Sequence, residues 1–491
     1  MESFAPLIVA AILSLFTPNL QAAPQATDVT RQITEAIRDQ QYSRAIHLVD
    51  AALEVTPKDA HLWTLKGIAS EREGDLRKAA ESFETALRFS PDYLPALEGA
   101  AEAAYKLGDD RAQLFLHRVV ALKPSDPTAH AMLGAIAYKR HDCKSAVAYF
   151  DRAESAISAN PAALAQYGVC LLIVDRAKDA VAVLTGALQL APADRRTRLV
   201  LAEAQCVSND PGGAIRTLDL LLFSETVESD ALALASSAYE ALGNTPKAVE
   251  LVRAAIIASP RNPQYYLDFA SLCFNHSSFD VGVDMIDAGL KLLPDSSPLY
   301  LARGVLNVQR AKYLDAEADF AKASELDPAQ NIASLARGLT LVQQDRLDSA
   351  LETARQEVAK HPDDAFLHYL IAEVLAQKGA SPGDAEFQQA VHEGERAVKL
   401  NPQFILAHDT LAGLYLKANR LQLAERHARE ALRLMPSDQI ALYRLIQTLR
   451  KSGDHQELRD LVKRLAQLRS DAREKEAEQN RYKIFELKPE K

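Results

Sequence analysis

Prolines recur along this chain at intervals close to 34 residues or a multiple of 34. The prolines that share this phase are Pro57, Pro91, Pro124, Pro192, Pro260, Pro294, Pro328, Pro362, Pro402 and Pro436. A fixed period of this length indicates a repeat architecture. The chain of 491 residues is also longer than the ~250–300 residues at which a single compact core stops growing. We therefore expect an array whose core grows in one dimension.

Small and large apolar residues keep the same phase as the prolines. An alanine lies twelve positions before many of them, at Ala45, Ala79, Ala180, Ala248, Ala316, Ala350, Ala390 and Ala424. A larger apolar residue lies eight positions before several, at Val49, Phe83, Leu184, Ile286 and Phe320. Two antiparallel helices cross closely only where small residues meet, and large residues beside them fill the holes. Each period is therefore predicted to be a helix–turn–helix unit that ends at its proline.

The most regular units carry one ordered set of residues, for example Trp63, Gly67, Ala79, Phe83, Ala86 and Pro91. This pattern resembles the tetratricopeptide-repeat (TPR) family, in its bacterial secreted or periplasmic type. The resemblance spans about residues 26–470. It implies an all-α fold without β-sheet: a right-handed α-solenoid of about 13 helix–turn–helix units, with about twenty-six helices.

The repeat departs from its pattern at three places. Ser158 and Thr226 stand where a proline belongs in their units. The unit near 365–404 carries an insertion, KGASPGDAEF, from Lys378 to Phe387. Its Gly, Ser and Pro predict a longer loop between two helices.

Both ends of the chain differ from the repeats. Residues 1–25 are predicted to be a signal peptide or N-terminal anchor, because residues 7–16 form an apolar run too short to span a bilayer. Small residues follow, so cleavage after Ala23 or Ala26 is expected. The region before the run is atypical, since it holds Glu2 and no Lys or Arg. The alternative is an extra apolar helix that caps the solenoid. Residues 471–491 form a charged tail, for which a solvating cap helix is preferred over an interaction tail.

Charge and motifs exclude several classes of function. A formal net charge of −10 disfavours nucleic acid and anionic membrane surfaces as partners. No catalytic, phosphate-binding or metal-binding motif occurs, so neither an enzyme nor a cofactor or metal site is expected. The four cysteines are too far apart for a CxxC motif and are interpreted as small core residues. Cys170 and Cys206 occupy similar places in adjacent units, so a disulfide between them is also considered.

The TPR resemblance implies that the first helix of each unit lines a concave groove at its second, fifth, ninth, twelfth and thirteenth positions. In the third and fourth units these positions include the polar residues Glu98, Glu102, Tyr105, Lys106, Tyr138 and Lys139. In units eight to eleven they are largely apolar: Leu267, Phe274, Leu301, Val305, Val308, Leu335, Leu339, Val342, Phe366 and Tyr369. Apolar residues on a groove suggest a partner that covers them. The alternatives are burial by tight coiling of the solenoid or by a homodimer.

These observations predict a non-catalytic scaffold or adaptor that binds a peptide or protein in its groove. The leader places it outside the cytoplasm, periplasmic or secreted. One alternative is a membrane-tethered assembly factor, should residues 1–25 stay uncleaved, since membrane contact is expected only then. Another is the regulatory subunit of an enzyme such as a transferase. Binding of chaperone tails is not predicted, because the family's Lys and Asn clamp positions hold Glu98, Glu102, Ala131 and Ala135.

Overall fold

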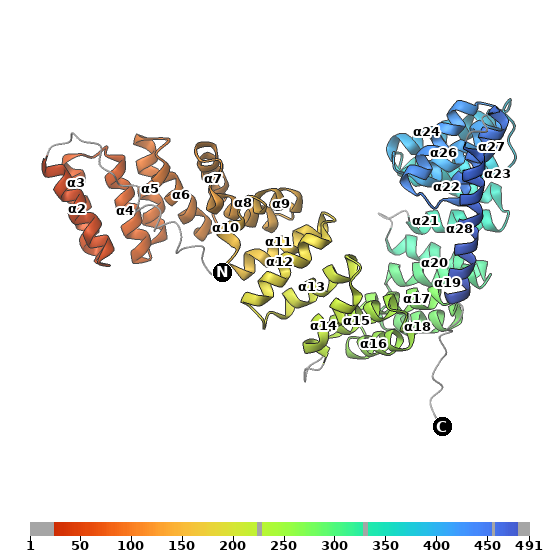
Figure 1. The fold of residues 1–491 in the computed structure, drawn as a ribbon, viewed down its shortest axis with the longest axis horizontal. Helices are drawn as coiled ribbons and strands as arrows, with labels where there is room; N and C mark the ends of the chain where they lie inside the picture. The colour runs from red at the N-terminus through yellow and green to blue at the C-terminus, as the bar shows by residue number, and fades with distance from the viewer. Residues whose placement is uncertain (1–23, 223–227, 328–331, 454–456, 480–491) are drawn as a thin grey trace, which may run out of the picture. The chain divides into compact units, whose positions relative to one another are not determined.

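The computed structural model describes residues 24–222, 228–327, 332–453 and 457–479. This part of the chain contains 27 α-helices and no strand. The helices follow one another as thirteen antiparallel pairs, with the short helix α10 as an extra turn (Figure 1). The prediction of an all-α array of about thirteen units is confirmed. The right-handed twist of the solenoid stays a prediction.

Contacts along the chain divide it into two units, Met1–Glu225 and Thr226–Lys491. The helices of the first unit are α2 (Pro24–Arg38), α3 (Tyr42–Val55), α4 (Ala60–Glu73), α5 (Leu76–Phe89), α6 (Leu94–Leu107), α7 (Arg111–Leu122), α8 (Pro127–Lys139), α9 (Cys143–Phe150), α10 (Glu154–Ile157), α11 (Pro161–Ile173), α12 (Ala177–Leu190), α13 (Arg195–Val207) and α14 (Pro211–Leu222). The boundary between the units lies beside Thr226, one of the three departures from the repeat, which is outside the described residues.

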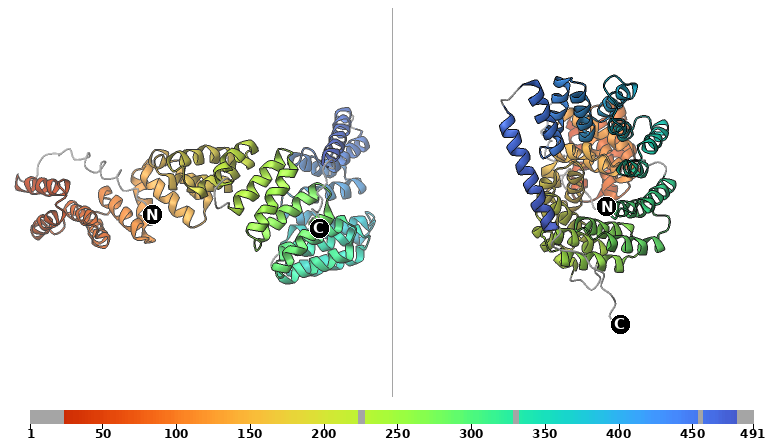
Figure 2. Two further views of the ribbon diagram at one scale, coloured as in Figure 1. Left: turned by 90° about the horizontal axis from the view of Figure 1, so that it is seen from below. Right: turned by 90° about the vertical axis from the view of Figure 1, so that its right-hand side faces the viewer.

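The second unit holds the remaining pairs, stacked along the chain (Figure 2). Its helices are α15 (Ser229–Ala241), α16 (Thr245–Ala258), α17 (Pro263–Asn275), α18 (Phe279–Leu292), α19 (Ser297–Gln309), α20 (Tyr313–Leu326), α21 (Ile332–Gln343), α22 (Leu347–Lys360), α23 (Ala365–Gln377), α24 (Ala385–Leu400), α25 (Ile405–Lys417), α26 (Leu421–Leu434), α27 (Gln439–Ser452) and α28 (Leu458–Gln479).

In several pairs a small residue of the first helix packs against a large residue of the second. Phe320 of α20 is almost wholly buried, and its ring lies against the main chain of Gly304 in α19. A Cβ atom on Gly304 would come within 2.4 Å of that ring. Gly67 faces Phe83 and Gly168 faces Leu184 in the same way. The packing predicted from the repeat is therefore present in both units.

The turns inside the pairs need one residue with positive φ. Gly108 supplies it between α6 and α7. In eight other turns a non-glycine residue takes this conformation: Gln40, His141, Asp175, Asn209, Ser277, Ala311, Asp345 and Asn419. The fold therefore imposes the same turn where the sequence offers no glycine.

The second helix of the fourth pair is broken. It consists of the eight-residue α9 and the four-residue α10, separated at residues 151–153. Asp151 in this break accepts a hydrogen bond from the Tyr167 hydroxyl of α11 and pairs with Arg176 at 2.9 Å. The break occurs in the unit that has Ser158 in place of proline. The insertion near residue 380 forms the expected loop over residues 378–384, and its last three residues lengthen α24.

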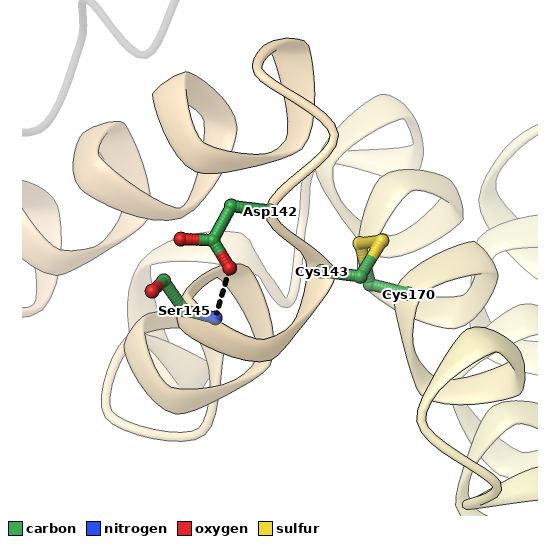
Figure 3. The surroundings of a disulfide bond; sticks show 4 residues. All are labelled: Asp142, Cys143, Ser145 and Cys170. Atoms are coloured by element: carbon green, nitrogen blue, oxygen red, sulfur yellow. Dashed lines mark hydrogen bonds between the residues drawn. A yellow bond between two sulfur atoms is a disulfide. The ribbon is translucent and has the colours of Figure 1, made fainter. Parts of the chain in front are cut away.

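A disulfide joins Cys143, the first residue of α9, to Cys170 of α11 (Figure 3). Their Cα atoms lie 4.8 Å apart. The side chain of Asp142 caps α9 through the Ser145 N–H at 3.0 Å. The predicted bridge between Cys170 and Cys206 is wrong. It would join the first helices of two neighbouring pairs. The start of a second helix lies closer to the first helix of the next pair than two such first helices lie to each other. Cys206 is a free thiol that is partly exposed, and Cys273 is free and buried.

The last described helix, α28, runs across position 470 without interruption. The division into residues 1–25, 26–470 and 471–491 stays a prediction. Residues 1–23 and 480–491, and with them most of the proposed leader and half of the proposed tail, lie outside the described residues. Among the described helices, none combines the length and the apolar character that crossing a membrane requires.

The packing inside the pairs can be tested with two glycines. Gly304→Ala should lower the free energy of unfolding by about 1–3 kcal/mol, because the new methyl group collides with Phe320. Gly186→Ala in α12 is the matched control. Outside the neighbouring backbone of its own helix, no atom lies within 4 Å of its new Cβ, so it should raise stability by about 0.5–1 kcal/mol. Denaturant titrations followed by circular dichroism measure both, and equal effects at the two sites would refute the packing.

Candidate functional site

The first helices of the second unit touch one another in succession. Contacts link α17 to α19, α19 to α21, α21 to α23, α23 to α25 and α25 to α27. Their outward side chains therefore form one continuous surface within this unit, which we call the first-helix face.

Nine of the ten predicted groove residues reach the surface of this face. Four of them are 37–43% exposed: Phe274, Val305, Leu339 and Phe366. Five more are half-buried: Leu267, Leu301, Val308, Leu335 and Val342. We call these nine residues the apolar stripe. Each fully covered Leu or Phe would contribute roughly 1.5–3 kcal/mol to binding before ordering costs.

Tyr369 differs from the other nine. Only 8% of it is exposed, because Phe404 at the start of α25 covers its ring with the centroids 5.1 Å apart. The ring of Phe366 also packs on Phe404, at 4.4 Å. Burial raises the pKa of the Tyr369 hydroxyl. Tyr369 thus belongs to the core beneath the stripe and offers little surface to a partner.

The groove positions around most of the stripe are uncharged. On α17, α19 and α21, the five groove positions of each helix hold no charged residue. Those that are not part of the stripe are Gln264, Ser271, Asn275, Pro298, Gln309, Ile332 and Gln343. Arg303 of α19 lies beside them, but its guanidinium is paired with Asp319 and Asp287, each at 2.5 Å. The surface therefore favours a partner segment that is itself apolar and uncharged.

Three further exposed apolar residues extend the first-helix face toward the C-terminus. They are Leu406 on α25 and Ile440 and Tyr443 on α27. They occupy the second or fifth positions of their helices, so the repeat register alone could have found them. The sequence-based list missed them because it ended at Tyr369.

Asp409 occupies the fifth position of α25, and its surroundings are unusual. It is 4% exposed, and both carboxyl oxygens are buried without a hydrogen-bond partner in the described structure. Burial raises the pKa of this carboxyl to about 7, and the negative charge of Asp438 adds to the effect. Arg444 opposes the shift only in part. Its guanidinium donates a hydrogen bond to the main-chain oxygen of Asp409.

The polar groove residues of the first unit are largely paired with one another. The ammonium group of Lys106 lies 2.8 Å from the Glu102 carboxylate and 2.7 Å from Glu71. The ammonium group of Lys139 lies over the ring of Tyr105 at 5.4 Å. Burial raises the pKa of Glu102, which is almost fully covered. This stretch therefore presents few free charges to a partner.

The described residues hold no group of three or more His, Cys, Asp or Glu side chains placed to bind a metal ion. Cys206 and Cys273 are poor nucleophiles, because burial raises the pKa of both thiols. In the described part of the chain, the first-helix face supplies mainly apolar contact area.

The buried Asp409 should make stability depend on pH. Its carboxyl is neutral in the fold up to about pH 7 but ionises near pH 4 in the unfolded chain, so its contribution to stability is lost as pH rises through this window. Asp409→Asn cannot ionise. The variant should therefore gain roughly 1–3 kcal/mol relative to the native protein between pH 5 and pH 8. Urea titrations at the two pH values measure this difference, and a difference of zero would contradict the buried, unpaired carboxyl.

Models of known families match the chain at both ends. One model described as tetratricopeptide repeat matches residues 30–93, 301–365, 335–397 and 410–473. A second model with the same description matches residues 72–136. Together they cover more than half of the chain.

Curated relatives are distant. The chain is 22% identical over 198 residues to the human protein O-mannosyl-transferase TMTC1, an alignment that covers 40% of this chain and 22% of that protein. It is 25% identical over 114 residues to anaphase-promoting complex subunit 3 of Schizosaccharomyces pombe, covering 23% of this chain and 17% of that protein. The chain thus spans about a fifth of the length of each.

Two solved structures are similar over most of the chain. The crystal structure of yeast Tom70 is 19% identical with a TM-score of 0.44, covering 93% of this chain and 96% of that one. The Cut9–Hcn1 heterotetramer of the APC/C is 13% identical with a TM-score of 0.37, covering 91% and 99%. With the family models, the thirteen helix pairs and their small-to-large packing in agreement, this chain belongs to the tetratricopeptide-repeat family.

Proposed function

We propose that this protein is a non-catalytic scaffold that binds a segment of a partner protein on the first-helix face of its second unit. The observation that carries the proposal is the apolar stripe on α17, α19, α21 and α23. Its exposed members are Phe274, Val305, Leu339 and Phe366. They come from the first helices of four successive pairs, and each of these helices touches the next. Scattered exposed apolar residues are normal, but a contiguous row of them is typical of an interaction site.

The partner segment is expected to be apolar and without charge. A charged side chain placed on the stripe would lose water and find no opposite charge at the groove positions of α17, α19 or α21. Arg303 cannot supply one, because Asp287 and Asp319 already hold it. A segment with several large apolar residues would cover the stripe without such a loss.

The proposed location is outside the cytoplasm, in the periplasm or the extracellular space. Two independent observations support it. Disulfides such as Cys143–Cys170 persist in oxidising compartments and are rare in the cytosol. The apolar run at residues 7–16 also has the length of a signal-peptide core. The activity named for the human relative is not proposed for this chain, since the match covers 22% of that protein.

The stripe can be tested without knowing the natural partner, by selecting from a displayed library of random twelve-residue peptides. Peptides enriched on the full chain should be rich in uncharged apolar residues. The triple variant Phe274→Ser, Val305→Ser and Leu339→Ser should bind them at least tenfold more weakly, because each serine removes apolar contact area. These three positions are exposed, so the helical circular dichroism spectrum should not change.

The control for this experiment lies on the second helices of the same unit. Ile257, Leu292 and Leu314 are exposed apolar residues of α16, α18 and α20. Replacing all three with serine removes at least as much exposed apolar surface but should leave peptide affinity within twofold. Loss of binding in this control, or full affinity in the stripe variant, would place the site elsewhere. A change from dimer to monomer in the stripe variant alone, seen by sedimentation, would instead favour the homodimer.

The location is tested by trapping thiols in cells of the native host. Alkylation before and after reduction should reveal two free cysteines, Cys206 and Cys273, and then all four. N-terminal sequencing of the same protein should begin after Ala23 or Ala26. Four free thiols on a chain that starts at Met1 would contradict a location outside the cytoplasm. A chain that starts at Met1, keeps its disulfide and sediments with membranes would favour the tethered assembly factor.

A further inference from the structure

A cavity of about 300 Å³ lies in the first unit, between α6, α7, α8 and α10. Its wall is mostly apolar, built from residues such as Leu116, Val119, Met132 and Ala156. This volume is at the lower end of the range for small-ligand pockets. The cavity belongs to a single unit and shares no residue with the apolar stripe.

The cavity lies where the repeat is irregular. Its α10 wall is formed by Ser155 and Ala156, beyond the break in the second helix of the fourth pair. These small side chains leave the space next to α7 and α8 unfilled. Because Asp151 is bonded to Tyr167 and Arg176, contacts to the next pair hold the break in place. The cavity is therefore a defined feature of the fold.

Three ionisable groups line the cavity beside this apolar wall. The Lys123 ammonium lies 2.6 Å from the Asp126 carboxylate and 3.9 Å from that of Glu98. Asp126 also accepts a hydrogen bond from the Ala129 N–H at 2.8 Å, which caps α8. Lys123 and Asp126 thus satisfy each other, and the three groups together carry a net charge of −1 when ionised.

Glu98, the third of these groups, has no close partner of its own among the described residues. No hydrogen bond from the described part of the chain reaches its carboxylate, although its side chain is mostly buried. Burial raises the pKa of Glu98, which reflects how little solvation and pairing the ionised form receives. The Lys123 ammonium stays 3.9 Å away, so a ligand that donates a hydrogen bond directly to this carboxylate would stabilise its ionised form.

We propose that this cavity binds a cationic nitrogen on an apolar stem, with the stem against Leu116, Val119 and Met132 and the nitrogen donating to Glu98. A cation supplies Glu98 with a hydrogen-bond donor and neutralises the net charge, whereas an anion would face two carboxylates against one lysine. The stem is limited to a few methylene groups by the volume. The same chemistry occurs in a free alkylamine and in a lysine side chain of a partner protein. The site is separate from the proposed stripe and does not depend on it.

Hexylamine, hexanol and hexanoate are suitable probes for the full chain, because they share one stem and differ in their charge. Ligand-observed NMR titration should give the tightest binding for hexylamine, weaker binding for hexanol and none for hexanoate. Glu98→Gln keeps the shape of the side chain and should weaken hexylamine about tenfold while leaving hexanol within twofold. Asp92→Asn, an exposed carboxylate just before α6, is the control for general electrostatics and should change neither.

A second variant fills the space. Ala156→Leu should block hexylamine and hexanol alike, and the Glu98→Gln comparison remains decisive even if this variant fails to fold.

Two short peptides, one with lysine and one with acetyl-lysine, show whether the bound nitrogen comes from a free amine or from a partner side chain. Binding of the lysine peptide alone assigns the cavity to a partner side chain, and binding of hexylamine alone assigns it to a free amine. No binding of hexylamine or the lysine peptide, or equal binding of hexylamine by Glu98→Gln, would overturn the proposal.

Discussion

The close approach of the two helices in each pair is the constraint on which this structure depends. It is possible because one helix presents a small residue where the other presents a large apolar residue, as at Gly304 and Phe320. At the Gly304 crossing there is no room even for one methyl group, so the two positions must change together or not at all. A solenoid repeats this contact with nearest neighbours only, and no distant part of the core can relieve a misfit. This explains why the 34-residue phase is visible through most of the sequence.

The fold could be predicted to the level of the helix pair, because the crossing residues and the terminal prolines are local signals with a fixed period. Three features could not. The positive-φ turns at residues such as Ala311 have no glycine to mark them, since packing of the flanking helices imposes the conformation. The break at residues 151–153 leaves the length of its repeat unchanged, so it does not disturb the phase. The Cys143–Cys170 bridge connects two helices of different kinds, and a comparison of equivalent positions between repeats does not reveal such a pair.

The candidate surface shows the same division between local and tertiary information. Register alone placed nine apolar residues at exposed or half-buried positions of the first-helix face. It could not show that Phe404 covers Tyr369, because Phe404 lies in the turn that follows a lengthened helix, outside the regular positions. Nor could it show that Asp409 would be buried beside Asp438, since each residue alone is an ordinary polar residue near the start of a helix. Where two neighbouring repeats meet, the identity of a residue matters less than what the next unit places against it.

The fourth pair shows how an array of this kind accommodates a defect. Its second helix stops after eight residues, whereas the other second helices have at least twelve, so it offers less surface to its neighbours. In a one-dimensional array that loss must be offset locally. The disulfide does so, because it ties the first residue of the shortened helix to the last turn of α11 and closes a loop of 27 residues. The hydrogen bond from Tyr167 and the ion pair with Arg176 fix the break itself through Asp151. With the start of α9 and the break both held by the next pair, the chain can leave a cavity beside α10 without losing the register of the units that follow.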